Sequence, residues 1–271
     1  MPDIPDIPPP PGHLKIEEGG AGILRVRIVN PARYNAMSLS MWEALGDTLA
    51  QVSQRTDLRA VVLQGEGERA FVSGADISEF GEQRNDPAQT ERYDRAVARA
   101  QDALTASPVP TLALIQGVCM GGGMGLALAC DLRYCNASAR FRIPAARLGL
   151  GYSREGVKRM CDILGASRVA DLFLTARIAD GAEAGRIGLV HEVFADADFP
   201  ALVQARVQAV AQNAPLTLRA ARMAMRHVLG SPGAPDAQQV DDAVQACFRS
   251  QDYQEGQMAF REKRAPAFMA R

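Results

Sequence analysis

The chain has 271 residues, of which 47% are hydrophobic, and it carries a formal net charge of −1. This length allows one large domain with a buried core, and the charge balance argues against nucleic acid as a main partner. Five cysteines without paired spacing and only three histidines argue against a disulfide framework and against a metal site. The mostly apolar neighbours of the cysteines are typical of free thiols in a reducing compartment, so we expect a cytoplasmic protein.

The first twelve residues are rich in proline and lack the basic and apolar regions of a secretory signal. No apolar run in the chain is long enough to span a bilayer, so we expect no membrane association. We predict a disordered tail at 1–12, a core at 13–198 and a C-terminal helical region at 199–271.

The predicted elements repeat in the order strand, strand, helix. Residues 14–16 and Ile23–Val29 alternate apolar and polar residues around a glycine-rich turn, which predicts a hairpin. Ser40 is a candidate N-cap for a helix that continues to about Val52. Further strands are predicted at 58–64, 70–72, 111–115, 132–135, 139–143 and 189–194, and further helices at 77–80, 90–106, 126–130, 157–164, 166–175, 182–186, 199–213, 216–229, 236–249 and 252–264. This order predicts an α/β fold followed by a helical appendage.

The most informative stretch is QGVCMGGGMGLALACDL at 116–132, where a buried strand leads through three glycines into an apolar helix. Glycines leave the peptide N–H groups accessible, and the first turn of a helix has free N–H donors, so an oxyanion would bind there. A phosphate-binding P-loop is excluded because Met124 and Gly125 stand where lysine and serine or threonine are needed, and a dinucleotide fingerprint is excluded by its glycine spacing. A glycine-rich turn that only lets the helix pack closely on a sheet remains the alternative.

A second bend, Ser73-Gly74-Ala75-Asp76-Ile77, also follows a predicted strand. Its Ala75 amide would be a second donor. Asp76 is expected either to cap the helix that follows or to stabilise it by its charge.

Taken with NPARYNAM at 30–37 and FLTARIADGAEAGRIGLVHEV near 180, the two bends resemble the crotonase (enoyl-CoA hydratase/isomerase) superfamily from Ile23 to the C-terminus. The resemblance implies a ββα spiral core, a C-terminal helical region that forms trimers or hexamers, and a coenzyme A thioester as substrate. It implies no covalently bound cofactor, since coenzyme A is part of the substrate. By motif position, the oxyanion-hole donors are the amides of Ala75 and Gly122.

The resemblance also implies where coenzyme A lies. Its adenine and pantetheine are expected along the turn at Asn35 and Ala36 and along the backbone of Ala75, Asp76 and Ile77. The segment FREKRAPAF resembles the part of the family that closes over the nucleotide, which places Phe260 and Lys263 there. For Lys263, a solvated basic helix end is the alternative.

The sequence departs from the hydratases of the family at two positions. Those enzymes use two glutamates to activate water and to protonate Cα, and here the positions hold Gly125 and Ala145. The position of an aspartate in dehalogenase and dienoyl isomerase relatives holds Ser153, which is a poor nucleophile without a neighbouring base.

The segment LGLGYSREGV at 148–157 resembles the methylmalonyl-CoA decarboxylase branch, whose active-site tyrosine corresponds to Tyr152. Decarboxylation forms an enolate by loss of CO2 and needs no base at Cα. The sequence therefore favours decarboxylation of a short malonyl-type thioester, with a packing aromatic as the alternative reading of Tyr152.

Two other functions stay open. Glu155 could serve as a displaced acid or base of a hydratase or isomerase, although a glutamate at a helix start also stabilises the helix dipole. A non-catalytic acyl-CoA-binding paralogue would bind thioesters without consuming them.

Overall fold

The structure, a computed structural model, describes residues 11–76, 79 and 86–271. Strands β1 (His13–Gly19) and β2 (Ile23–Val29) form the predicted antiparallel hairpin around a short 3-10 turn, Gly20–Gly22. A second 3-10 turn, Pro31–Arg33, follows β2. Along β2 the apolar side chains of Leu24, Val26 and Ile28 face the main core, so Arg25 and Arg27 face the opposite side of the sheet.

Two sheets form the centre of the molecule. The larger has the order β1-β2-β3-β5-β7-β10, in which all pairs from β2 onward are parallel. Its further strands are β3 (Ala60–Gly65), β5 (Thr111–Ile115), β7 (Leu132–Asn136) and β10 (Glu192–Phe194). The smaller has the order β4-β6-β8-β9, with strands β4 (Ala70–Val72), β6 (Val118–Met120), β8 (Arg140–Arg142) and β9 (Ala179–Asp180).

Successive strands alternate between the two sheets. β3, β5 and β7 lie in the larger sheet, and the strand after each of them, β4, β6 and β8, lies in the smaller one. A helix follows β4 and β6, so the chain winds as a spiral of strand, strand, helix, as predicted. The strands predicted at 132–135 and 139–143 are present as β7 and β8, and they belong to different sheets.

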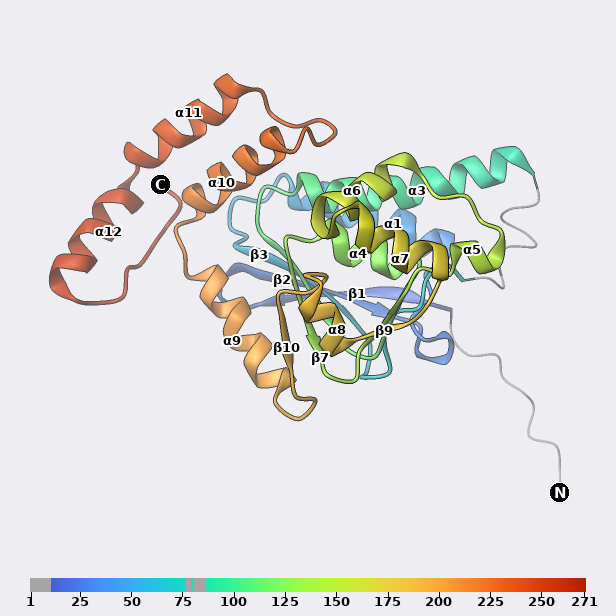
Figure 1. The fold of residues 1–271 in the computed structure, drawn as a ribbon. Coiled ribbons are helices and arrows are strands. Elements are labelled where there is room, and N and C mark those ends of the chain that lie inside the picture. Colours follow the sequence, from blue (N-terminus) through green and yellow to red (C-terminus); the bar gives the residue numbers. More distant parts are fainter. Residues whose placement is uncertain (1–10, 77–78, 80–85) are drawn as a thin grey trace.

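Helices cover the larger sheet on both faces (Figure 1). Helices α1 (Leu39–Val52), α3 (Pro87–Ala106) and α4 (Gly122–Ala129) lie over one face, where their apolar residues join the main hydrophobic cluster. Helix α1 begins two residues earlier than predicted, because Ser38 and not Ser40 is the N-cap and accepts a hydrogen bond from the Met41 amide. The helices that follow β8 and precede β10 in the chain are α5 (Ala145–Leu148), α6 (Arg154–Leu164), α7 (Ala166–Thr175) and α8 (Gly181–Arg186).

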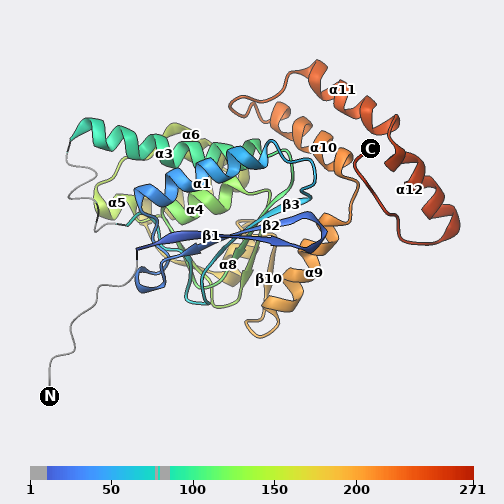
Figure 2. The same ribbon diagram turned by 180° about the vertical axis from the view of Figure 1, so that it is seen from behind.

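The predicted C-terminal helical region contains two different parts. Helix α9 (Phe199–Ala211) packs on the other face of the larger sheet through Phe199, Val203 and Val207, which form a second hydrophobic cluster with strand residues. Helices α10 (Pro215–Val228), α11 (Ala237–Phe248) and α12 (Gln251–Glu262) extend away from the sheets, as both views show (Figures 1 and 2).

Within the described residues, no helix combines the length and the apolar character needed to cross a bilayer. The same part of the chain contains no group of three or more side chains placed to hold a metal ion. All five cysteines are free, and Cys119, Cys130 and Cys135 are buried.

Candidate active site at two glycine bends

The bends that follow β4 and β6 lie beside each other. β4 and β6 are parallel neighbours, so both strands end at the same edge of the smaller sheet. An ideal Cβ atom built on Gly74 would lie only 3.7 Å from the Gly122 nitrogen and 3.4 Å from the Met120 carbonyl oxygen. Gly74 has a φ of +122°, a conformation that few other residues adopt.

The Ala75 amide points away from the neighbouring backbone at Met37. The Met37 amide donates to the Gly74 carbonyl oxygen (2.8 Å), and the Asp76 amide donates to the Met37 carbonyl oxygen (2.9 Å). Because peptide groups alternate in direction along an extended chain, the Ala75 N–H group between these two bonds faces the other side. No backbone acceptor for it is found among the described residues.

The Gly122 amide is free for a different reason. Gly122 is the first residue of α4, where the N–H groups have no acceptor within the helix. The preceding Gly121 amide donates to the Arg142 carbonyl oxygen of β8 (3.0 Å), whereas no backbone acceptor for Gly122 occurs in the part of the chain that the structure describes. The structure thus brings two free amides, from two separate bends, to one edge of the smaller sheet.

Close packing fixes the position of α4. An ideal Cβ on Gly123 would lie 2.2 Å from the Val72 carbonyl oxygen, so only glycine lets α4 approach β4 this closely. Trp42 of α1 lies beneath Gly122, 3.0 Å from its ideal Cβ position. The Trp42 Nε1 donates to the Tyr93 hydroxyl (3.0 Å), which itself donates to the Met37 carbonyl oxygen (3.2 Å). One hydrogen-bonded chain therefore supports both bends.

The Asp76 side chain does not project from the bend. Its carboxylate is 6% exposed and accepts a hydrogen bond from Arg33 Nη1 at 2.6 Å. The Asp76 carboxylate is thus held by Arg33, and the expected contact of coenzyme A with the Asp76 backbone stays a prediction. Ile77, the other predicted contact at this bend, lies outside the described residues.

The turn at Asn35 and Ala36 is buried and internally bonded. The Asn35 amide group donates to the carbonyl oxygens of Glu66 (3.0 Å) and Ala70 (2.7 Å) and accepts from the Asn30 amide (3.0 Å). The Ala36 amide donates to Arg33, and its carbonyl oxygen accepts from the Asn30 side chain. These hydrogen bonds hold the loop beside β4. Because they use the polar groups of the Asn35 side chain and of the Ala36 backbone, few polar groups of these two residues remain for direct contact with a ligand.

Gly125 and Ala145, the positions without the expected glutamates, differ in their surroundings. Ala145 is buried as the first residue of α5. At Gly125, an ideal Cβ would lie 2.4 Å from Gln101 Nε2, so the side chain of Gln101, from α3, fills the space that a side chain at 125 would enter. The Gln101 Oε1 accepts a hydrogen bond of 2.7 Å from Arg159 Nη1 of α6.

Tyr152 and Glu155 lie at the start of α6 but in different environments. The half-buried Tyr152 ring packs edge-on against Phe173 (centroid distance 5.3 Å), and burial raises the pKa of its hydroxyl, an effect that the positive charge of Arg159 opposes. Glu155 is 50% exposed and pairs with Arg154 at 2.8 Å, which lowers the pKa of its carboxyl. Ser153 is the N-cap of α6 and accepts from the Gly156 amide.

Phe260 and Lys263 do not meet the bends within one chain. They lie at the end of α12, where Phe260 is 87% exposed and Lys263 has the left-handed conformation of a helix C-cap. Helix α12 and helix α5, whose N-cap Pro144 borders Gly121, lie at opposite ends of the molecule in both views (Figures 1 and 2).

Gln101 and Arg159 were not identified from the sequence, because the hydrogen bond between them joins α3 to α6, two helices that are far apart in the chain. A signal was present for Gln101, which falls four residues after Val97 and eight after Tyr93, in line with residues that pack on the main core.

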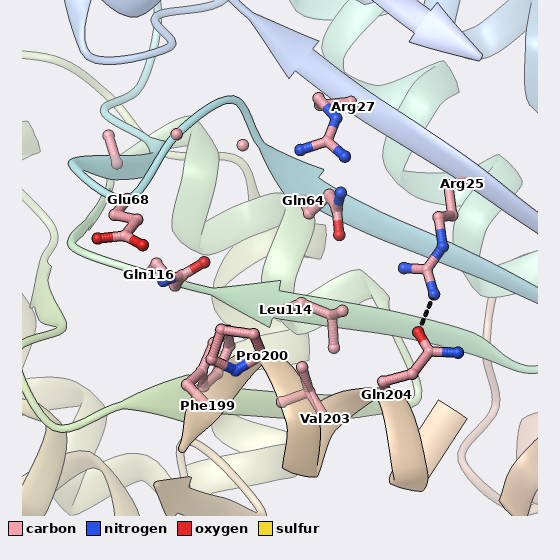
Figure 3. A pocket seen from close by; sticks show the side chains of 13 residues that line it. Arg25, Arg27, Gln64, Glu68, Leu114, Gln116, Phe199, Pro200, Val203 and Gln204 are labelled. Carbon is pink, nitrogen blue, oxygen red and sulfur yellow. Dashed lines mark hydrogen bonds between the residues drawn. The ribbon is translucent and has the colours of Figure 1, made fainter. Parts of the chain in front are cut away.

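A separate hollow of about 260 Å³ lies between the larger sheet and α9 (Figure 3). The side chains of Arg25, Arg27 and Gln64 line one wall and those of Phe199, Val203 and Gln204 the other, with a hydrogen bond between Arg25 and Gln204. None of its lining residues belongs to the two bends, so this hollow is distinct from the candidate site.

Comparison with known proteins gives the family. The sequence pattern described as enoyl-CoA hydratase/isomerase matches residues 18–271. The mouse protein named enoyl-CoA hydratase domain-containing protein 2, mitochondrial, is 32% identical over 259 residues, covering 92% of this chain and 85% of its own. The short-chain-enoyl-CoA hydratase of Clostridium acetobutylicum is 27% identical over 239 residues, covering 88% and 91%.

A solved structure agrees with these sequence matches. The crystal structure described as an enoyl-CoA hydratase/carnithine racemase from Magnetospirillum magneticum has a TM-score of 0.88 and 32% identity, covering 95% of this chain and 96% of that chain. The likeness spans both sheets and the C-terminal helices, and it confirms the predicted α/β crotonase-like fold. The chain belongs to the enoyl-CoA hydratase/isomerase family, within the crotonase superfamily.

Proposed function

We propose that the protein is an enzyme acting on a coenzyme A thioester, whose carbonyl oxygen binds between the amides of Ala75 and Gly122. The observation that carries this proposal is the approach of the two bends, with 3.7 Å between the ideal Cβ of Gly74 and the Gly122 nitrogen. Two donors aimed at one oxygen stabilise the enolate that forms when charge moves onto that oxygen. Loss of one such donor typically costs about 3–4 kcal/mol of transition-state stabilisation.

The reaction that best suits the surrounding side chains is decarboxylation of a short malonyl-type thioester. The bond between Cα and the carboxylate carbon breaks, CO2 leaves, and the electron pair delocalises from Cα onto the thioester oxygen as an enolate. A proton from water then adds to Cα. This sequence needs no base at Gly125 or Ala145, and the neutral Tyr152 hydroxyl would orient the carboxylate out of the thioester plane.

Hydration or isomerisation of an enoyl thioester is the second candidate, favoured by the family description and by the hydratase names of the relatives. It would need a displaced acid or base, such as Glu155. Pairing with Arg154 lowers the pKa of the Glu155 carboxyl, which makes it a weaker base, and its place in the first turn of α6 suits stabilisation of the helix dipole.

We also propose that copies of the chain assemble as a trimer or a pair of trimers, with Phe260 and Lys263 of one copy reaching the coenzyme A of another. Exposed apolar side chains on the C-terminal helices support an assembly surface: Met225, Val228, Leu229, Val244, Phe248, Tyr253, Met258 and Phe260. A cytoplasmic location, with no tightly bound cofactor beyond the substrate's coenzyme A, belongs to the same proposal.

The deciding experiment incubates the purified protein separately with methylmalonyl-CoA and with crotonyl-CoA and follows CO2 release and thioester mass. Release of CO2 with formation of propionyl-CoA supports decarboxylation. Hydration of crotonyl-CoA without CO2 release from methylmalonyl-CoA supports the second candidate. A rise in melting temperature with both thioesters but turnover of neither indicates the non-catalytic binding protein.

A further inference from the structure

The side chain that fills the space beside Gly125 points to the chemistry of the acyl group. We infer that Gln101 is a specificity-determining residue whose amide Nε2 donates a hydrogen bond to an anionic oxygen on the acyl chain. This inference rests on the proposed function. The substrate class is then an acyl-CoA with a carboxylate near the thioester carbonyl, as in malonyl-type thioesters, and not an unsubstituted enoyl-CoA.

The orientation of the Gln101 amide follows from its partner. Its Oε1 accepts from Arg159 Nη1 at 2.7 Å, and a guanidinium can only donate, so Nε2 is the atom turned toward Gly125. Among the described residues the Gln101 side chain makes its hydrogen bond through Oε1 and none through Nε2, and Gln101 is only partly buried. An unpaired donor is thus presented where relatives with hydratase activity are expected to hold a carboxylate.

The position is within reach of a substituent on the thioester. Gly125 follows Gly122 by three residues, which is almost one helical turn and a rise of about 4.5 Å. The Gln101 donor therefore lies within about one helical turn of the Gly122 amide along α4.

The local charge favours an anion over a neutral acceptor. The Arg159 side chain is 16% exposed, and its other hydrogen bond is a longer one, 3.2 Å, to the largely exposed carboxylate of Asp102. Arg159 therefore polarises the Gln101 amide and contributes positive potential there. The same charge acts on Tyr152, which precedes α6, and it lowers the pKa of the tyrosine hydroxyl against the larger effect of burial.

The test compares two coenzyme A thioesters that differ in one group. In 2-sulfonatopropionyl-CoA a sulfonate stands in place of the carboxylate and cannot leave as CO2, and in isobutyryl-CoA a methyl group stands there. Dissociation constants are measured by isothermal titration calorimetry for the full-length protein, for Gln101→Leu and for the isosteric Gln101→Glu. Gln89→Leu, about three turns earlier on α3, is the matched control.

The wild type and Gln89→Leu are expected to bind the sulfonate about tenfold more tightly than isobutyryl-CoA, the ratio that one hydrogen bond to a charged group provides. Gln101→Leu should lose this preference while its affinity for isobutyryl-CoA changes less than about twofold. Gln101→Glu, which keeps the shape and the contact with Arg159, should reverse the preference through repulsion between like charges. Thermal unfolding verifies that each variant is folded.

Equal binding of the two thioesters by the wild type, or an unchanged ratio in both Gln101 variants, overturns the inference and leaves the proposed function standing. Failure of the wild type to bind either thioester or free coenzyme A overturns the proposed function, and the inference falls with it. These two failures are therefore distinguishable in one set of titrations.

Discussion

Asn35 fixes the turn after β2 through three hydrogen bonds and a φ of +55°, a conformation that asparagine tolerates better than most side chains. Removal of its amide would leave the Asn30 amide and the carbonyl oxygens of Glu66 and Ala70 without these partners in a buried region. The residue supports β4, the strand that leads to the Ala75 bend.

We expect Asn35→Ala to lower the free energy of unfolding by about 3 kcal/mol, because each buried group left unpaired costs about 1–3 kcal/mol. Urea denaturation followed by circular dichroism measures the change. A loss below about 0.5 kcal/mol, the usual range for surface substitutions, would show that the turn does not depend on this side chain.

Tyr152 and Glu155 offer a matched pair of substitutions at the start of α6. Tyr152→Phe keeps the packing on Phe173 but removes the hydroxyl, so we expect kcat for methylmalonyl-CoA to fall by roughly 10- to 100-fold at unchanged melting temperature. Glu155→Gln should leave kcat within about twofold, since this carboxylate pairs with Arg154 at the surface. The reverse pattern would assign the chemistry to Glu155.

At the scale of elements, the packing of α4 on β4 sets the distance between the two bends. We expect Gly123→Ala to cost about 1–3 kcal/mol of stability and to reduce kcat/KM, because its Cβ would force α4 away from Val72. Gly20→Ala is the control, since nothing lies within 4 Å of its ideal Cβ. Denaturation and steady-state kinetics measure both variants, and equal behaviour of the two would contradict this account of the bends.

Local sequence patterns predicted most elements but not how they pair. Apolar runs such as 111–115 identify buried strands, yet nothing local assigns β7 and β8 to different sheets, since parallel pairing joins residues far apart in the chain. β6 was overlooked because its three residues directly precede the glycines. The two amides could be placed from motif positions, whereas Gln101 meets Gly125 only through the packing of α3 on α4, which local periodicity does not specify.

At the scale of the whole molecule, an ion pair between the buried Arg222 and the partly buried Asp131 joins the C-terminal helices to the core. The Arg222 guanidinium of α10 contacts the Asp131 carboxylate and donates to the carbonyl oxygens of Ser107 and Thr105. The C-terminal tail is tied back in a similar way, since Arg59 donates to the Phe268 carbonyl oxygen at 2.7 Å. These contacts hold the exposed apolar side chains of α10 to α12 in one orientation relative to the sheets.

The buried thiols make the free energy of unfolding of the whole protein depend on pH in the alkaline range. Burial raises the pKa of Cys130 and of Cys135 from 9.0 to about 12, so the folded state favours the protonated thiols. The contribution of these two thiols to the free energy of unfolding is fully present below pH 9. It is lost as the pH rises toward 12, because the unfolded chain then releases the thiol protons more readily than the folded chain does. Urea denaturation between pH 8 and about 11 should show a falling free energy of unfolding, with a shallower slope for Cys135→Ala. An identical slope for that variant would exclude this cause.

The convergence of the Ala75 and Gly122 amides on one oxygen is tested most directly by infrared spectroscopy of a bound thioester. Isobutyryl-CoA labelled with ¹³C at the carbonyl gives a band that is identified by its isotope shift. Two fixed hydrogen bonds aimed at the oxygen should polarise this carbonyl and move its stretching band to lower frequency than in free isobutyryl-CoA in water. A band that keeps its solution frequency when the thioester is bound would contradict the account.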